Sequence, residues 1–285
     1  MGRQRELAGS DALAVVAEDR RFVTALARGL EVLRSFRPAD RWLAHQEIAR
    51  RTGLPQATVS RLTFTLTALG YLRHRGTRGE YALAPGVLAL GFSMLNNFDI
   101  GRIARPHMQA LADETQAAVS LGVRRSLTMV YVAHCRSAAP LTLGLDVGTQ
   151  LPLASTAMGR ALYVALQPAE QARLLSDLEA ESQQPARGNA PPRPAWPQLR
   201  QGLERAQLQQ RQLGYVTSET EWEADISAAG VAIDLGDGRE PLSLTVGGPA
   251  ARLQGKRLSD EIAPALVRSA LAIRHTLQSG GWTDY

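Results

Sequence analysis

The sequence lacks most features of secreted, membrane-bound or disulfide-stabilised proteins. Its 285 residues include a single cysteine, Cys135, which excludes a disulfide within the chain and makes a reducing cytoplasm the expected location. No run approaches the roughly 18 consecutive apolar residues of a membrane span. Residues 1–10 are polar and do not resemble a secretory signal. We therefore expect no membrane partner.

Local signatures of catalysis are missing as well. Neither an HExxH helix nor a GxxxxGK[ST] loop occurs, and no second cysteine is present for a zinc site. His134 and Cys135 are adjacent on an expected strand, so their side chains point to opposite faces and cannot form a nucleophile–base pair. The acidic residues within 219–225 are better explained by a solvated loop than by a metal site. We expect no catalysis, no cofactor and no metal.

The basic excess of the chain is confined to its first hundred residues. Residues 1–100 hold 14 arginines and nine acidic residues, a net charge of +5, whereas residues 101–285 hold 18 charges of each sign. A positive surface in the first part would attract a phosphate backbone. A charge of this size is also within ordinary variation, so it does not establish nucleic-acid binding alone.

Residues 43–83 have the layout of a winged helix-turn-helix. Ile48 and Ala49 give a first helix its inner face, Gly53 permits a tight turn, and Pro55 suits the start of a second helix. An apolar stripe predicts the buried face of that second helix. The stripe consists of Val59, Leu62, Leu66 and Leu69. The residues left for the major groove are Gln56, Ala57, Thr58, Ser60, Arg61 and Phe64.

Two of these residues have more than one interpretation. Arg61 could donate two hydrogen bonds to guanine, or it could be a solvated helix arginine. Phe64 could touch a thymine methyl group or pack under the N-terminal arm. Short strands at 71–73 and 81–83 enclose a basic tip, which predicts a wing that contacts phosphates without reading sequence. Its basic residues are Arg73, His74, Arg75 and Arg78.

The flanking segments complete a four-part organisation. An expected helix at 22–36 carries Val23, Leu26, Leu30 and Leu33 on one face, and a second at 85–98 is apolar on more than one side, which is typical of a helix that pairs with a partner. We expect an N-terminal arm (1–20), a winged helix-turn-helix domain (21–84), a linker and dimerisation helix (85–100), and an effector-binding domain (101–285).

The second domain is predicted to be α+β, with an antiparallel sheet and helices packed on it. Expected strands are 117–123, 129–135, 140–145, 215–218, 228–235 and 242–246. Expected helices are 102–115, 156–166, 169–179, 199–213 and 256–278. An Asp237-Gly238 pair indicates a hairpin turn. Ser155 and Thr156 lie where a loop enters a helix, so they could bind an anion such as a carboxylate or simply cap the helix.

Several motifs carry a resemblance to a known family, and they occur in order along nearly the whole chain. They are ALARGLEVL (25–33), IARRTGLP (48–55), TV (58–59), RL (61–62), LGYL (69–72), LPLASTAMGRAL (151–162) and RQLGY (211–215). With them the sequence resembles the IclR family of bacterial transcription regulators. The stretch DRRFVTAL (19–26) also resembles the branch of that family that governs aromatic-acid catabolism.

The resemblance implies a winged helix that binds double-stranded DNA at a palindromic operator as a homodimer or homotetramer, and a C-terminal domain that binds a small metabolite. The implied DNA contacts are Arg28, Gln56, Ala57, Thr58, Ser60 and Arg61. The implied effector contacts are Leu143, Leu151, Ala157, Met158, Ser218, Ile226, Ala228 and Thr245. Ser218 stands where an acidic residue can occur and Ala228 where a cysteine can occur, so a glyoxylate-type effector is not expected.

We therefore expect a ligand-responsive transcription regulator whose effector is a small carboxylic acid, with an aromatic acid as the narrower expectation. The competing interpretation is a small-molecule-binding enzyme with a basic N-terminal appendage. The sequence leaves open the operator, the effector, and whether the protein activates or represses transcription.

Overall fold

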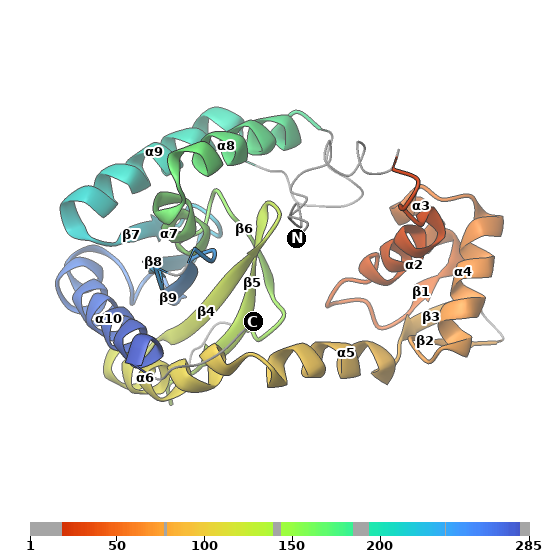
Figure 1. The fold of residues 1–285 in the computed structure, drawn as a ribbon, viewed down its shortest axis with the longest axis horizontal. Helices are drawn as coiled ribbons and strands as arrows, with labels where there is room; N and C mark the ends of the chain where they lie inside the picture. Colours follow the sequence, from red (N-terminus) through yellow and green to blue (C-terminus); the bar gives the residue numbers. More distant parts are fainter. Residues whose placement is uncertain (1–18, 77–78, 139–143, 185–193, 237, 280–285) are drawn as a thin grey trace. The chain divides into compact units, whose positions relative to one another are not determined.

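The computed structural model describes residues 19–76, 79–138, 144–184, 194–236 and 238–279 (Figure 1). These fall into two compact units, one ending at Asn97 and the other beginning at Phe98. Within the described residues, no helix has the length and apolar character needed to cross a membrane. Each unit is described separately below.

The first unit is a winged helix-turn-helix. Its helices are α2 (Thr24–Arg34), α3 (His45–Thr52), α4 (Gln56–Ala68) and α5 (Pro85–Asn96). Its sheet has the order β1-β3-β2, with β1 (Leu43–Ala44), β2 (Leu72–Arg75) and β3 (Glu80–Leu83) all antiparallel. A small core joins α2, α3, α4 and the sheet through Val32, Leu43, Ile48, Val59, Leu66 and Leu72, whereas α5 has no buried residue.

The turn between α3 and α4 forms as the sequence predicts. Gly53 ends α3 with φ +68°, a backbone conformation that glycine adopts without strain. Pro55 then precedes α4 in an extended conformation, where its missing N–H costs no helical hydrogen bond. These two residues therefore set the angle at which the second helix leaves the first.

The predicted buried stripes are only partly correct. Val59 and Leu66 are buried in α4, but Leu69 is 63% exposed, and on α2 the buried residue is Val32 while Leu26 is 63% exposed. Thr63 is fully buried instead, because its hydroxyl donates to the Val59 carbonyl oxygen at 2.9 Å and so leaves no unpaired polar atom. Helical spacing identifies an apolar face on α2 and on α4. It does not predict which residues of that face other elements of the chain bury.

The second unit is built on a six-stranded antiparallel sheet with the order β6-β5-β4-β9-β8-β7. The strands are β4 (Ala118–Arg125), β5 (Thr128–Cys135), β6 (Gln150–Pro152), β7 (Val216–Glu219), β8 (Ile226–Ile233) and β9 (Leu242–Pro249). The helices are α6 (Asp99–Thr115), α7 (Ala157–Ala165), α8 (Pro168–Ser182), α9 (Trp196–Leu213), the π-helical η1 (Arg257–Ile262) and α10 (Ala263–Ser279).

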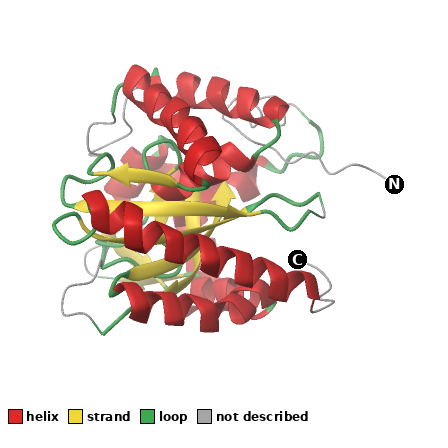
Figure 2. Ribbon diagram, turned by 90° about the vertical axis from the view of Figure 1, so that its left-hand side faces the viewer, coloured by secondary structure: helices red, strands yellow, loops and turns green. Residues whose placement is uncertain are grey.

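Helices cover both faces of this sheet (Figure 2). On one face α6 and α10 pack into the larger core, which contains Met108, Leu121, Val246 and Leu266. On the other face α7 contacts the strands directly, and α8 and α9 pack outside it. The α+β architecture predicted from the sequence is therefore confirmed.

Most element boundaries shift by a few residues, and the larger differences from the prediction are the following. No strand occupies 144–145, the described part of the strand expected at 140–145; the edge strand is β6, where Leu151 pairs with Met129 of β5. With three residues, β6 is too short to show an alternating pattern. Helix α6 begins at Asp99, before the expected position, and the closing helix opens with the π-helical segment η1. Asp237 of the expected turn lies outside the described residues, whereas Gly238 has φ +80°.

Candidate functional site

The outer face of α4 presents the side chains expected of a recognition helix. Gln56, Ala57, Ser60 and Arg61 are exposed, and Thr58 is half-buried. Phe64 is 76% exposed. Arg28 of α2 is exposed too and borders the same groove as Thr58 and Arg61. The first unit therefore brings the six candidate DNA contacts expected on α2 and α4 to one surface.

The two wing arginines of β2 lie against a tryptophan that sequence reasoning missed. The guanidinium carbons of Arg73 and Arg75 lie 5.1 Å and 4.3 Å from the ring centroid of Trp42. The strand register accounts for this, because Arg73 pairs with Ala82, whose neighbour Tyr81 pairs with the residue after Trp42. Cation–π contacts of this kind hold an arginine in place without neutralising it. Arg78 lies outside the described residues.

Not every arginine near the helix-turn-helix is available for a phosphate. Arg51 is mostly buried and pairs with Asp40 and Glu47, and Arg50 also pairs with Glu47. Hydrogen bonds from Arg50 and then Arg51 lower the pKa of Glu47 to about 2. Arg50 and Arg51 therefore fasten α3 in place, whereas Arg28 and Arg61 are exposed, and Arg75 of the wing is exposed but also lies 3.7 Å from a carboxylate oxygen of Glu80.

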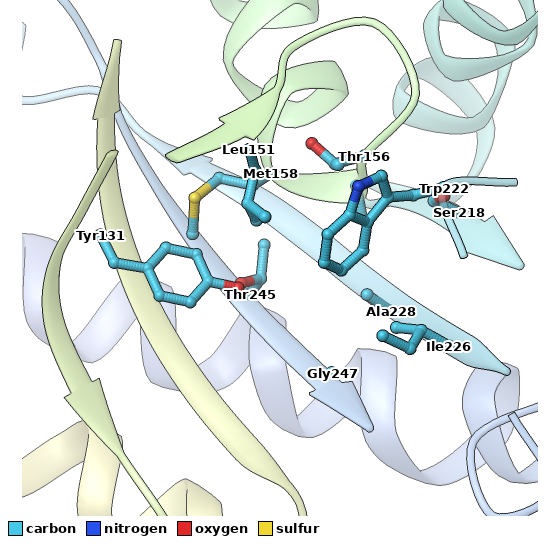
Figure 3. Close-up of a pocket in the computed structure, with 11 residues that line it drawn as sticks. Tyr131, Leu151, Thr156, Met158, Ser218, Trp222, Ile226, Ala228, Thr245 and Gly247 are labelled. Carbon is cyan, nitrogen blue, oxygen red and sulfur yellow. The ribbon is translucent and has the colours of Figure 1, made fainter. Parts of the chain in front are cut away.

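A small pocket opens on the α7 face of the second unit (Figure 3). Its cavity volume is about 30 Å³. Eight of the ten residues expected to bind an effector line it: Leu151, Thr156, Ala157, Met158, Ser218, Ile226, Ala228 and Thr245. Ser155 is buried next to it and accepts a hydrogen bond from the Ser218 hydroxyl through its carbonyl oxygen, at 2.8 Å. Leu143 lies outside the described residues.

The N-terminus of α7 forms one wall of the pocket. Thr156 is the N-cap, and its hydroxyl oxygen accepts from the Gly159 N–H at 3.2 Å. The first two N–H groups of a helix have no intrahelical acceptor, and here they belong to the pocket residues Ala157 and Met158. Glycines let α7 approach this closely, since a Cβ on Gly230 would lie 2.5 Å from the Ala157 carbonyl oxygen. The helix thus turns its positive end toward the cavity.

Three lining residues were missed: Tyr131, Trp222 and Gly247. Tyr131 and Trp222 supply the aromatic surface of the pocket (Figure 3). An aromatic residue within a strand and another within an acidic loop carry no local signal of a binding site. Only the assembled sheet brings these side chains to the helix terminus.

The expectation of a solvated acidic loop is wrong for Glu221. Its carboxylate oxygens accept from both terminal nitrogens of Arg160 at 2.8 Å and 2.7 Å, and Arg205 pairs with it as well. Arg160 is 1% exposed and also donates to the carbonyl oxygens of Ala154 and Thr217, each at 3.1 Å. Because Trp222 follows Glu221 directly, this network fixes the loop that places the indole at the pocket.

Two family models match the chain. The model described as the IclR helix-turn-helix domain matches residues 25–76, and the model described as the bacterial transcriptional regulator IclR C-terminal domain matches residues 92–275. The chain belongs to the IclR family of bacterial transcription regulators. In this IclR-family regulator, the first match spans α2 to β2, and the second spans the effector-binding domain with its pocket.

Named relatives of this regulator are similar over nearly its whole length. The HTH-type transcriptional regulator TsaQ1/TsaQ2 of Comamonas testosteroni is 33% identical over 86% of this chain and 84% of its own. A crystal structure of an IclR-family regulator from Brucella abortus is 40% identical, covers 92% of this chain and 96% of its own, and gives a TM-score of 0.79.

The same fold occurs in a more distant IclR homologue. The homologue from Microbacterium hydrocarbonoxydans, solved in complex with 4-hydroxybenzoate, is 20% identical, covers 90% of this chain and 99% of its own, and has a TM-score of 0.66. At this identity the similarity concerns the fold.

The family assignment favours a DNA-binding, effector-responsive regulator over the enzyme alternative. The structure agrees with the expected separation of His134 from Cys135. The Cys135 thiol lies near the Arg105 carbonyl oxygen of α6, whereas the His134 ring contacts Ser120 on the other face of the sheet. These two side chains therefore lie on opposite faces of the sheet and do not form a nucleophile–base pair.

Proposed function

We propose that this regulator acts in the cytoplasm, binds a palindromic operator with α4 in the major groove and the wing on the backbone, and responds to a small aromatic carboxylate. The observation that carries the effector part is the pocket in which the α7 N-terminus faces Tyr131 and Trp222. The DNA part is supported by the exposed polar face of α4 beside the cationic wing.

We propose a second copy of this chain as the partner of α5. Leu88, Leu90, Phe92 and Met94 are 63%, 58%, 54% and 46% exposed on this helix. An apolar groove of about 600 Å³ runs between α2, α4 and Leu90. Pairing two copies across these surfaces would bury the apolar side chains and present two recognition helices to half-sites about 34 Å apart.

The oligomer is tested by light scattering coupled to size-exclusion chromatography. Phe92→Glu would dissociate the dimer and weaken operator binding. Leu208→Glu, at a 55% exposed leucine of α9, is the control and would leave the dimer intact. If the Phe92→Glu protein remains dimeric, α5 is not part of the dimer interface.

DNA recognition is tested with a duplex selected from a random library and with an unselected duplex. Arg61→Ala would weaken binding to the selected duplex roughly 10-fold to 100-fold and binding to the unselected duplex much less. The reason is that a bidentate base contact contributes about 1–3 kcal/mol of discrimination. Arg75→Ala would weaken both alike and reduce the slope of log K against log salt by about 0.9. Equal losses on both duplexes for Arg61→Ala would contradict its role in base reading.

The effector class follows from the chemistry of the pocket lining. No lysine, arginine or histidine is among the described lining residues, so a carboxylate would be bound by the N–H groups of the α7 terminus. An aromatic ring would then lie against Tyr131, Met158 and Trp222 (Figure 3).

The present cavity is too small for a benzene ring. Its volume of about 30 Å³ suits a single water, whereas a cavity that binds benzene measures roughly 150 Å³. Trp222 lies on a loop and is half-buried, so it is the lining side chain that a ligand would displace most readily. Ligand binding should therefore change the fluorescence of Trp222.

Thermal shift with benzoate and 4-hydroxybenzoate tests the effector class; the latter is the compound bound in the Microbacterium hydrocarbonoxydans homologue. A ligand at a hundred times its Kd stabilises a protein by about 2.7 kcal/mol. The hits should also change operator affinity in an anisotropy assay. If no aromatic acid raises the melting temperature at millimolar concentration, the aromatic effector is wrong.

A further inference from the structure

A β-bulge brings two polar side chains of β5 to the same face of the sheet. Leu121 pairs with Ala133 but Gly122 pairs with Tyr131, so Val132 is an extra residue in β5. Without it, Tyr131 and His134 would point to opposite faces. With it, their rings stack at a centroid distance of 5.9 Å and an interplanar angle of 13°. The bulge thus places His134 directly behind a residue of the effector pocket.

A chain of hydrogen bonds runs from the surface to that pocket. The Nε of Arg136 donates to Nε2 of His134 at 3.2 Å, and Nδ1 of His134 lies 2.9 Å from the Ser120 hydroxyl oxygen. The Ser120 hydroxyl also acts on the phenol of Tyr131, a lining residue of the pocket, and lowers its pKa as a hydrogen-bond partner. At the outer end Arg136 is anchored by the Leu145 carbonyl oxygen at 2.8 Å and by Asp146.

Arg136 determines which group donates and which accepts in each of these hydrogen bonds. A guanidinium can only donate, so Nε2 of His134 must be the acceptor and the neutral ring must carry its hydrogen on Nδ1. That hydrogen is donated to Ser120, whose single hydroxyl proton is then free to go to the Tyr131 oxygen. The proton of Tyr131 itself is left for a group inside the pocket.

The charge states of both rings agree with this direction. Burial, and then the nearby charge of Arg136, lower the pKa of His134 against an opposing effect of Asp146, so the ring is neutral at pH 7. Burial raises the pKa of Tyr131 above its ordinary value despite the hydrogen bond from Ser120, so the phenol keeps its proton.

The other hydroxyls that line the pocket have already used their protons. Thr156 donates to the Pro152 carbonyl oxygen at 2.7 Å, Ser218 to the Ser155 carbonyl oxygen at 2.8 Å, and Thr245 to the Ser120 carbonyl oxygen at 3.4 Å. Among the described lining hydroxyls, Tyr131 is therefore the one whose proton remains for a ligand.

We propose that Tyr131 is a specificity-determining residue that donates a hydrogen bond to an acceptor group of the effector, and that Arg136, through His134 and Ser120, is the positioning residue that sets this polarity. The inference rests on the proposed effector function and adds to it that the carboxylate bound by the α7 N–H groups also accepts from Tyr131, since Ala157, Met158 and Tyr131 line the same small cavity. A ligand with only apolar groups at that position would leave the buried hydroxyl unpaired.

The first test compares benzoate with toluene, which has the ring but no acceptor, by calorimetry on the full-length protein. Tyr131→Phe should weaken benzoate about 10-fold to 100-fold, because a hydrogen bond to a charged group is lost, and should leave toluene unchanged or tighter. Tyr163→Phe is the matched control, since Tyr163 is also buried but its hydroxyl meets Gln207 away from the pocket. Equal benzoate affinities for the wild type and Tyr131→Phe would overturn the proposal while leaving the effector function intact.

A second test does not depend on any ligand. Nitrogen-15 NMR of the histidine rings reports which ring nitrogen carries the proton, and the proposal requires the Nδ1–H form for His134 in the wild type. Arg136→Ala should relax this preference and weaken benzoate, whereas Arg136→Lys, which can still donate to Nε2, should retain both. An Nε2–H ring in the wild type would overturn the proposal even if no aromatic acid bound, a result that would separately refute the effector class.

Discussion

Replacing Glu221 with glutamine tests how the loop that carries Trp222 is held. The change removes one negative charge and leaves the guanidinium of Arg160, which is 1% exposed, without its countercharge. Rehydration of that cation is blocked, because Gly202 packs against it so closely that an added Cβ would lie 2.1 Å from a terminal nitrogen of Arg160. The unpaired charge must therefore be tolerated or the loop must move.

The expected loss of stability follows from the exposure of the two partners. Breaking a buried ion pair by removing one member costs about 3–5 kcal/mol. The Glu221 side chain is 30% exposed, so we expect the lower part of that range or slightly less, about 2–3 kcal/mol. For a domain of this size that corresponds to a fall in melting temperature of about 4–12 °C by calorimetry. Glu204→Gln is the control, because its pair with Arg200 is 60% and 62% exposed and should contribute at most about 0.5 kcal/mol.

The pH dependence provides the decisive result. Burial raises the pKa of Glu221, but the hydrogen bonds and the charge of Arg160 lower it by more. The net pKa is therefore below the ordinary 4.5. The stabilisation is therefore complete above about pH 4.5 and is lost as pH falls through the lowered pKa. The difference in melting temperature between wild type and Glu221→Gln should narrow below that pH. A difference as small as that of Glu204→Gln, or one that is constant from pH 6 to pH 3, would refute the reasoning.

Further variants test the wing, the glycines and the pocket. Trp42→Ala should weaken DNA binding roughly 3-fold to 10-fold in an anisotropy assay at fixed salt, since exposed cation–π contacts contribute about 0.5–1 kcal/mol each; a smaller effect is expected for Trp42→Phe, and unchanged affinity would contradict the role of the ring. Gly159→Ala should destabilise the second unit by about 3 kcal/mol in urea unfolding, because its Cβ would lie 2.1 Å from the Leu153 carbonyl oxygen. Gly91→Ala in α5, where nothing lies within 4 Å, should instead stabilise by up to about 1 kcal/mol. Trp222→Ala should improve the affinity for two-ring acids relative to benzoate in calorimetry, and no change in that ratio would show that the indole does not limit the cavity.

The elements that the sequence predicts well are those specified by local backbone chemistry. Gly53 and Gly214 tolerate the left-handed backbone that ends α3 and α9, Pro55 restricts the backbone before α4, and all three lie at element boundaries in the structure. Local chemistry at Ser155 and Thr156 also predicts the loop that enters a helix at Thr156, whereas the pocket residues themselves were implied by the family resemblance of the motif at 151–162. Such features need only a few consecutive residues.

Features that depend on a partner element could not be predicted in this way. Trp42 meets the wing arginines only because β3 lies between β1 and β2. Glu221 was expected to be solvated because nothing near it in sequence indicates that Arg160, on another element, is buried within reach. The exposed leucines of α2 and α5 give a second example. Periodicity identifies an apolar face, but it does not show which element or partner covers that face.

One inserted residue changes which side chains of β5 face the pocket, compared with the regular alternation of a strand. Counting by two along β5 places Tyr131 on the face of Ala133 and Cys135, both of which are buried in the core against α6 and α10. The bulge at Val132 transfers Tyr131 to the α7 face, next to His134 and opposite the helix terminus. The motif thus supplies N–H groups for the carboxylate of a ligand, and the irregularity in β5 adds a hydroxyl that can donate to the same group. Because a bulge results from the pairing of two strands and not from either strand alone, the polar selectivity of this pocket is a property of the assembled sheet.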